Sequence, residues 1–334
     1  AAIAGKIVAM LREPFELVSR PYQISGSVGI TIFPDDGQDV QTLLKNADIA
    51  MYKAKQAGKN RFQFYAPQMH VDAQLRMQLE TDLREALEQN SFKLHYQPVV
   101  DTGTGVLVGA EALIRWEHVV RGTIGPTEFI EVAEDCGLIV PIGEWVLREA
   151  VQQWCSWRAK GYAPLRLSVN VSGVQFRENN LHRLISELIA ENGIDPDYLV
   201  LEITESVLME QNNNSEANMR EIKELGVSFA LDDFGTGFSS LSYLKRFPVD
   251  IVKIDQSFVQ DCPGDRNDVL LVQAIVNMAH SLNLKVTAEG VETEAQRDLL
   301  SEFGCDYLQG YLISRPLIAD DFEALIQQRQ YRVE

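Results

Sequence analysis

The stretch VSFALDDFGTGF, Val227 to Phe238, is the one that the rest of the chain is expected to support. Its pattern predicts a strand that ends in two adjacent carboxylates and is followed by a glycine-containing loop. Residues 228–232 alternate and lean apolar, which predicts a half-buried strand that ends at Asp232 and Asp233. Two neighbouring ionised carboxylates repel each other and need a cation, a shared proton or open water. A divalent metal site is one interpretation, and the N-cap of a following turn is the other.

The composition is typical of a folded protein with room for one large barrel and a smaller part. The chain has 334 residues, of which 46% are hydrophobic. Its formal net charge of −18 should repel nucleic acid and anionic membrane surfaces. A phosphate-bearing substrate would therefore have to be met by metal ions or by a few placed Lys and Arg side chains.

The cysteine and histidine patterns argue against zinc sites and disulfide frameworks. The four cysteines show no CxxC spacing and the five histidines form no HExxH pattern, which fits a reducing compartment and a cytoplasmic location. No apolar run approaches the roughly 20 residues that a membrane span needs, so no membrane contact is expected within this chain. Because the first residue is not methionine, we expect the chain to begin inside a longer protein. A membrane anchor upstream of residue 1 is compatible with this expectation.

The apolar pattern divides the chain into three parts. Residues 1–66 predict a small α/β fragment with an opening helix, a strand over Gln23–Phe33, an amphipathic helix and a final short strand, RFQFY. Residues 67–90 predict a charged amphipathic helix, which is either a signalling connector or ordinary packing. Residues 91–330 alternate between strands and helices and form the largest part.

Eight strands are expected in the largest part, most of them separated by helices. They are placed at residues 92–100, 105–115, 165–171, 199–203, 228–232, 250–254, 285–289 and 305–309. This α/β pattern predicts a TIM-like (β/α)8 barrel. Only DTGTG joins the first two strands, which is too short for a crossover helix, so the first strand should run antiparallel in a variant barrel.

Alternation along the strands points polar residues into the barrel, mostly near the C-terminal ends where barrel enzymes hold their chemistry. These inward residues are Glu111, Asn170, Glu202, Asp232, Lys253, Glu289 and Gln309. Each alone could be a cap, half of an ion pair or a backbone support. Such structural roles do not explain all seven residues together, because burying several uncompensated charges in one place costs free energy. Hard oxygen ligands without Cys or His imply Mg²⁺ or Mn²⁺.

The segment EALIRW, residues 111–116, resembles the namesake motif of the EAL family, the cyclic di-GMP phosphodiesterases. The similarity runs from about Leu79 to Leu325 and includes YQP (96–98), SVNVS (168–172), LEITE (201–205), DDFGTGFSSL (232–241), VKID (252–255), AEGVE (288–292) and QGY (309–311). This resemblance implies a metal-dependent hydrolase that opens cyclic di-GMP, a bacterial second messenger, to linear pGpG. The alternative is a non-catalytic module that binds cyclic di-GMP and passes a signal on.

The resemblance also implies a role for each inward residue. Glu111, Asn170, Glu202 and Asp232 would be ligands of one metal, Asp232 and Asp233 would be shared toward a second, Lys253 and Glu289 would lie beside the attacking water, and Gln309 would support the site. None of these positions departs from the family pattern, which favours an active enzyme over a binding module.

The residue types indicate how such a site would work. A metal ion would lower the pKa of a bound water, Glu289 would take or hold its proton, and Lys253 would orient it and offset phosphoryl charge. Gln97 and Arg115 are candidates for contacts to the substrate phosphate and guanine, with Gln309 beside them, although Arg115 could equally hold a ligand carboxylate. Ca²⁺ should inhibit because it is larger and takes more ligands at longer distances.

The loop FGTGFSSLSYL, residues 234–244, contains two glycines and lies directly after the aspartate pair. We hypothesise that Glu205 fixes this loop by accepting its hydrogen bonds, so that activity depends on loop geometry; helix capping is the alternative role. The family resemblance links this loop and the following helix to dimerisation, which implies a homodimer through the barrel.

Residues 27–65, SVGITIFPDDGQDVQTLLKNADIAMYKAKQAGKNRFQFY, resemble the C-terminal half of a GGDEF domain, the diguanylate cyclase fold. The GGDEF or GGEEF signature and the nucleotide-binding half before it do not occur in this sequence. The segment is therefore not expected to make cyclic di-GMP and would be a truncated domain or a structural remnant.

Overall fold

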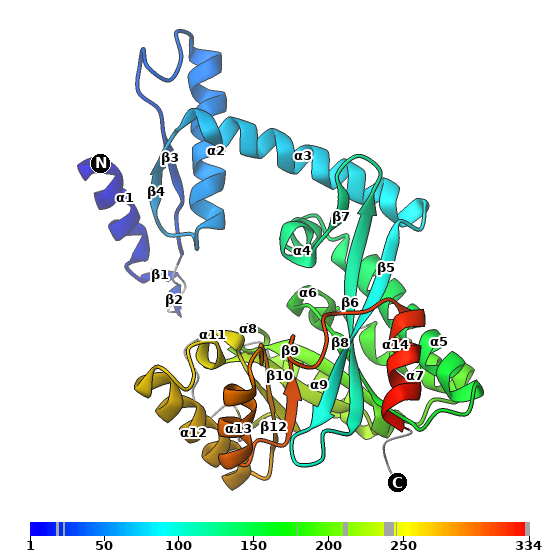
Figure 1. Ribbon diagram of the computed structural model, residues 1–334. Helices are drawn as coiled ribbons and strands as arrows, with labels where there is room; N and C mark the ends of the chain where they lie inside the picture. The colour runs from blue at the N-terminus through cyan, green and yellow to red at the C-terminus, as the bar shows by residue number, and fades with distance from the viewer. Residues whose placement is uncertain are drawn as a thin grey trace. The chain divides into compact units, whose positions relative to one another are not determined.

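The computed structural model describes residues 1–330 apart from 18–19, 23, 179, 210–212, 237–243 and 245. The chain divides into two compact units, Ala1–Asp82 and Leu83–Glu334 (Figure 1). The three parts expected from the sequence, 1–66, 67–90 and 91–330, stay a prediction. Within the described ranges, every helix is too short or too polar to pass through a bilayer.

The first unit is built on two short parallel strands joined by a helix. β3 (Val28–Ile30) pairs with β4 (Phe62–Phe64), and α2 (Val40–Gln56) connects them. The strand predicted over residues 23–33 is shorter in the structure because β3 has only the three residues of β4 to pair with. The other elements are α1 (Ala2–Arg12), the antiparallel strands β1 (Phe15–Leu17) and β2 (Arg20–Tyr22), and α3 (Pro67–Glu88), which continues into the second unit.

Eight strands of the second unit close into a barrel (Figure 1). They are β5 (Phe92–Asp101), β6 (Leu107–His118), β8 (Arg166–Asn170), β9 (Leu199–Thr204), β10 (Ser228–Phe234), β11 (Ile251–Ile254), β12 (Lys285–Ala288) and β13 (Tyr307–Gln309). Consecutive strands are neighbours, and β5 closes the ring by pairing with both β6 and β13. The short β7 (Gly122–Ile124), which was not predicted, pairs with the end of β6.

The first barrel strand has the orientation that the sequence predicts. β5 runs antiparallel to β6 and to β13, while the other barrel pairs are parallel. The variant (β/α)8 barrel is therefore confirmed. Because β6 and β8 to β13 are parallel, their C-terminal ends meet at one mouth of the barrel.

Helices surround the barrel and cover the apolar outer face of its strands. They are α4 (Pro126–Asp135), α5 (Ile139–Ala159), α6 (Gly173–Arg177), α7 (Leu181–Asn192), the 3-10 helix η1 (Pro196–Tyr198), α8 (Glu205–Met209), α9 (Asn213–Glu224), α11 (Gln256–Val259), α12 (Arg266–Ser281), α13 (Glu294–Glu302) and α14 (Ala319–Gln330). On β9, Leu199, Leu201 and Ile203 form part of this buried outer layer.

The inside of the barrel has an apolar layer below a polar one. Val200, Ala230 and Ile251 form a buried cluster on β9, β10 and β11. Because side chains alternate along a strand, the next inward positions toward the mouth lie two residues further along each of these strands. These positions are Glu202, Asp232 and Lys253, so the apolar cluster forms a floor beneath charged groups.

Candidate active site

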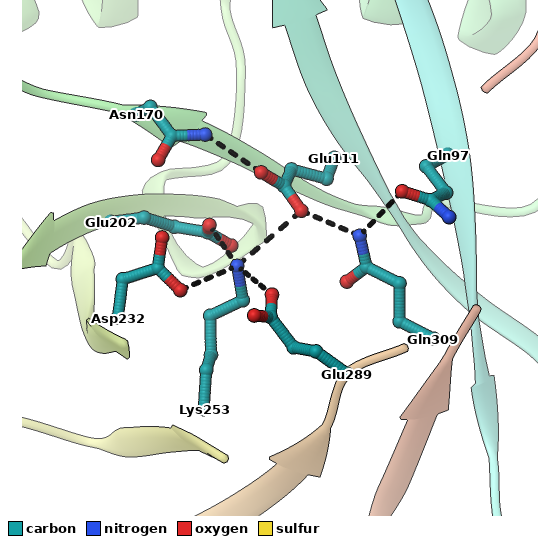
Figure 2. Close-up of polar contacts among 8 residues, drawn as sticks. All are labelled: Gln97, Glu111, Asn170, Glu202, Asp232, Lys253, Glu289 and Gln309. Carbon is teal, nitrogen blue, oxygen red and sulfur yellow. Dashed lines mark hydrogen bonds and ion pairs between the residues drawn. The ribbon is translucent and has the colours of Figure 1, made fainter. Parts of the chain in front are cut away.

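All eight barrel strands contribute a polar side chain to the mouth, and Figure 2 shows these side chains converging. They are Gln97 on β5, Glu111 on β6, Asn170 on β8, Glu202 on β9, Asp232 on β10, Lys253 on β11, Glu289 directly after β12, and Gln309 on β13. The structure thus brings together every inward residue that strand alternation selected.

Lys253 lies at the centre of this cluster, with only 2% of its surface exposed. Its Nζ lies 2.6 Å from Glu289 Oε1, 3.0 Å from Asp232 Oδ1 and 3.3 Å from Glu111 Oε2, and it also forms an ion pair with Glu202. The contacts with Glu111 and Glu202 are hydrogen bonds as well. One ammonium group therefore faces four carboxylates, which leaves an excess of negative charge in a buried site.

Two side-chain amides hold the carboxylate of Glu111. Asn170 Nδ2 donates to Glu111 Oε1 at 2.7 Å, and Gln309 Nε2 donates to Glu111 Oε2 at 2.6 Å. Gln309 Nε2 also donates to Gln97 Oε1 at 3.1 Å (Figure 2). Because both oxygens of Glu111 accept from an amide, the orientation of this carboxylate is fixed by its neighbours.

Burial and like charges shift the pKa values of this cluster. Burial raises the pKa of Glu202 well above its ordinary value, and the neighbouring Glu111 charge adds to the effect. Burial also raises the pKa of Glu289 to about 8. For Glu111, burial works in the same direction, but the Lys253 charge and the amide donors outweigh it and lower the pKa. Burial by itself would lower the pKa of the Lys253 ammonium. The surrounding carboxylates outweigh burial, so this pKa lies well above its ordinary value.

Asp233 reaches the mouth because β10 is irregular beside it. In a regular strand, neighbouring side chains point to opposite faces. The pairing of β10 with β11 changes register between Leu231 and Phe234, and Asp233 has a left-handed φ of 53°, which Asp adopts more readily than most residues. Carboxylate oxygens of Asp232, Asp233 and Glu289 consequently lie within 4.8 Å of one another.

This set of side chains suits a hard divalent cation. Its oxygen atoms come from carboxylates and amides, which are the ligands that Mg²⁺ and Mn²⁺ prefer. Asp232 belongs both to the carboxylates around Lys253 and to the more open group with Asp233 and Glu289. Oxygen ligands are therefore available on both sides of Asp232, and their surplus negative charge favours a cation.

The cluster opens into a cavity of about 770 Å³, which is within the usual size range of small-molecule sites. Asn170, Asp232 and Glu289 form part of its polar lining, and Ile130 of α4 and Ile142 of α5 form part of its apolar lining. The cavity thus combines an acidic end with apolar surface, as a ligand with both phosphate and ring groups would need.

Glu205 contacts the first residue after β10. Its Oε1 accepts a hydrogen bond from the backbone N–H of Gly235 at 2.7 Å, and Glu205 is 8% exposed. The remainder of the predicted loop lies largely outside the described residues, because 237–243 are not among them. The effect of this contact on activity stays a prediction.

Arg115, a candidate for a substrate contact, lies with its guanidinium against its own strand. It is half-buried, and its Nη1 donates to the backbone carbonyl of Ile114 at 2.8 Å. Burial lowers the pKa of its guanidinium, while Tyr311 and Glu111 oppose that shift. Gln97 and Gln309 line the cavity. A substrate contact by Arg115 stays a prediction.

Tyr311 is a cavity-lining residue to which the sequence analysis gave no role. It is the last residue of the QGY motif, directly after Gln309 and Gly310. Strand alternation could not select it, because it follows the end of β13. The motif itself was the one indication in the sequence.

The fold and the site define a variant (β/α)8 barrel whose mouth presents an acidic, oxygen-rich centre suited to divalent cations. The chain belongs to the EAL domain family, which matches residues 80–316. Residues 1–61 match the diguanylate cyclase GGDEF domain.

Two named relatives are similar to almost the whole of this chain. The bifunctional diguanylate cyclase/cyclic di-GMP phosphodiesterase MucR of Pseudomonas aeruginosa is 43% identical over 326 residues, which cover 98% of this chain and 48% of MucR. The cyclic di-GMP phosphodiesterase NbdA of the same organism is 39% identical over 332 residues, which cover 99% of this chain and 42% of NbdA. This chain therefore spans about half or less of these relatives.

The structural comparison agrees with the sequence comparison. The structure of the PaMucR phosphodiesterase in complex with c-di-GMP superposes with a TM-score of 0.71 and 44% sequence identity, covering 73% of this chain and 99% of that one. The barrel fold is thus that of solved EAL domains.

Proposed function

We propose that the barrel unit is a metal-dependent phosphodiesterase that hydrolyses cyclic di-GMP to linear pGpG. The observation that carries this proposal is the single ammonium of Lys253 among four carboxylates at the mouth of a cavity. Membership of the EAL family and relatives named as cyclic di-GMP phosphodiesterases support the same activity.

Mg²⁺ or Mn²⁺ would be held by residues from neighbouring strands. The implied ligands are Glu111, Asn170, Glu202, Asp232 and Asp233. A bound ion supplies a water of lowered pKa and neutralises charge on the phosphoryl group. Ca²⁺ is proposed to inhibit, because it prefers more ligands at longer distances than the smaller ions.

The chain's own side chains would bind the substrate, position it and handle protons. Lys253 offsets the negative charge that builds on the phosphoryl oxygens, and Glu289 holds or accepts a proton beside it. Gln309 keeps Glu111 in place through its 2.6 Å hydrogen bond and, with Gln97, lines the cavity that receives the substrate. Opening one ester bond of the ring gives the linear product.

A direct assay tests this function. The full chain is incubated with cyclic di-GMP and either Mg²⁺ or Mn²⁺, and pGpG is measured by chromatography. We expect pGpG from the parent, none from Asp232→Asn, and parental amounts from the exposed control Glu294→Gln. Intact cyclic di-GMP binding without pGpG formation would instead identify a non-catalytic binding module.

Two further properties belong to this proposal. A homodimer through the barrel unit is proposed from the family resemblance of the loop after β10, and light scattering coupled to gel filtration tests it. A monomer at all concentrations would contradict the homodimer.

A cytoplasmic location is proposed as well, and the four free cysteines support a reducing environment.

A further inference from the structure

A small internal cavity lies inside the barrel, beneath the charged groups of the mouth. Its volume is about 30 Å³, and Glu202, Lys253 and Gln309 form part of its lining. The apolar cluster on β9, β10 and β11 lines it as well, together with Ser168 on β8 and Thr287 on β12. The cavity therefore occupies the layer directly below the acidic cluster, in a different space from the larger cavity that receives the substrate.

Small side chains explain why this layer leaves a space. Its inward residues lie two positions before those of the mouth, because alternate residues of a parallel strand face the interior. Barrel interiors are usually filled by bulky branched side chains, whereas this layer contains Gly109, Ser168 and Ala230. A polar cavity of more than about 10–15 Å³ can hold a water molecule. The hydroxyls of Ser168 and Thr287 make this cavity polar and suited to water.

The side-chain amide of Gln309 lacks one hydrogen bond. Its Nε2 donates to Glu111 Oε2 at 2.6 Å and to Gln97 Oε1 at 3.1 Å. Its Oε1 is buried and has no hydrogen-bond partner among the described residues. Turning the amide over would place Oε1 against the Glu111 carboxylate, where two acceptors repel each other. A buried acceptor without a donor costs free energy, so a donor is required beside Gln309, and this residue lines the internal cavity.

We propose that the internal cavity is a binding site for an ordered water molecule, which donates a hydrogen bond to Gln309 Oε1. The water accepts hydrogen bonds from the hydroxyls of Ser168 and Thr287, and it gives its second proton to the Glu202 carboxylate. These four partners satisfy both donors and both acceptors of one water molecule. Buried waters with such partners are part of the structure and are costly to remove.

This water gives Ser168 and Thr287 a role as positioning residues. It fixes the amide of Gln309 with Nε2 toward Glu111, and Gln309 in turn holds the Glu111 carboxylate. Outer hydrogen-bond partners of this kind orient the ligands of a metal and tune its affinity. The effect on metal binding rests on the proposed function, because that function makes Glu111 a metal ligand. The water site itself does not rest on it.

A high-resolution crystal structure of the full chain, grown without divalent ions, tests the water site directly. We expect density for a water molecule within about 3.2 Å of Ser168 Oγ, Thr287 Oγ1 and Gln309 Oε1. A cavity without such density would overturn the proposal. Density that contacts neither hydroxyl would overturn it too, because Ser168 and Thr287 would then hold no water.

The affinity for Mn²⁺, measured by calorimetry without substrate, tests the positioning role. Thr287→Val keeps the shape of the side chain and removes the hydroxyl, so we expect it to raise the Kd for Mn²⁺ about fivefold. Ser168→Ala should raise it in the same direction, and Thr287→Ser, which keeps a hydroxyl, should restore the parental Kd. Gln309→Met should raise the Kd about tenfold or more, because it removes the direct partner of Glu111.

A double variant separates this role from a general loss of stability. Thr287→Val combined with Gln309→Met should bind Mn²⁺ no more weakly than Gln309→Met alone, because both changes interrupt the same chain of hydrogen bonds. Independent structural damage would instead add. Thr123→Val makes the same substitution at an exposed residue of β7 and should match the parent.

Two results would overturn the positioning role. One is a Kd of Thr287→Val equal to that of the parent, and the other is a double variant in which the two effects add. These measurements do not require turnover, so a parent that binds Mn²⁺ but forms no pGpG would contradict only the proposed function. A parent that binds no Mn²⁺ would overturn the metal-dependent function and the positioning role together, and the crystal structure would still decide the water site.

Discussion

The carboxylate of Glu205 accepts a 2.7 Å hydrogen bond from the backbone N–H of Gly235, joining the end of β9 to the loop after β10. Gly235 follows Asp233 by two residues and has a left-handed φ of 101°. The contact therefore fixes the backbone that carries one of the proposed metal ligands.

Replacing Glu205 should loosen this backbone and weaken metal binding. We expect Glu205→Ala to lower kcat about tenfold and to raise the Mg²⁺ concentration needed for half-maximal rate, because the loop contact acts through ligand geometry. Glu205→Gln keeps an acceptor oxygen and should recover most of the rate. Full turnover and unchanged Mg²⁺ dependence in Glu205→Ala would remove this role.

Removing the charge of Lys253 should separate metal binding from the reaction rate. We expect Lys253→Met to bind Mn²⁺ and to lose at least about a hundredfold in kcat, since its positive charge is proposed to act on the phosphoryl oxygens. Calorimetry gives the metal affinity, and pGpG formation gives the rate. The exposed Lys160→Met is the control, and a parental rate in Lys253→Met would show that the proposed role is wrong.

The choice of ion should decide whether the site works. Chelation of divalent ions should abolish turnover, Mg²⁺ or Mn²⁺ should restore it, and added Ca²⁺ should inhibit the Mg²⁺-supported rate. Glu111→Ala should remove turnover with every ion, because it removes an implied ligand. Turnover that persists in excess chelator, after dialysis, would contradict metal dependence.

Asp306 should make stability depend on pH. Burial raises the pKa of its carboxyl, but hydrogen bonds from Lys285 (2.7 Å), His280 (2.9 Å) and the Val286 N–H (2.9 Å) together outweigh burial and lower it. Because the folded pKa lies below the unfolded one, the stabilisation is present above the unfolded pKa and is lost as pH falls through the folded pKa.

Asp306→Asn should therefore lower the free energy of unfolding by about 1 kcal/mol near neutral pH. The difference from the parent should shrink below about pH 4, where the carboxyl of the parent protonates. Urea unfolding at several pH values measures this difference, with the exposed Asp298→Asn as the control. A difference that is constant over the whole pH range would contradict the expected role.

Strand-level features could be predicted from the sequence because they depend on local alternation. Glu202, Asp232 and Lys253 were assigned to the barrel interior by the apolar residues on either side of them, and the structure places them there. The short DTGTG connection likewise predicted the antiparallel pairing of β5 and β6. These features follow from one or two neighbouring elements.

Other features depend on contacts that no local pattern reports. The irregular pairing of β10 that turns Asp233 to the mouth arises between two strands, and the direction of the long Arg115 side chain depends on its surroundings. The β7 strand exists only because the end of β6 offers it a pairing edge. Tyr311 follows the last residue of β13, and strand alternation does not predict where the side chain of a residue outside a strand points.

The reversed direction of β5 decides where the polypeptide joins the barrel. Phe92, at the start of β5, pairs with Trp116 near the end of β6, whereas Asp101 pairs with Tyr307 at the start of β13. The chain consequently enters the barrel at the rim that carries the acidic cluster, and the turn over residues 102–106 lies at the opposite end. Residues 83–91 therefore lead directly to the edge of the barrel at which the proposed metal ligands lie.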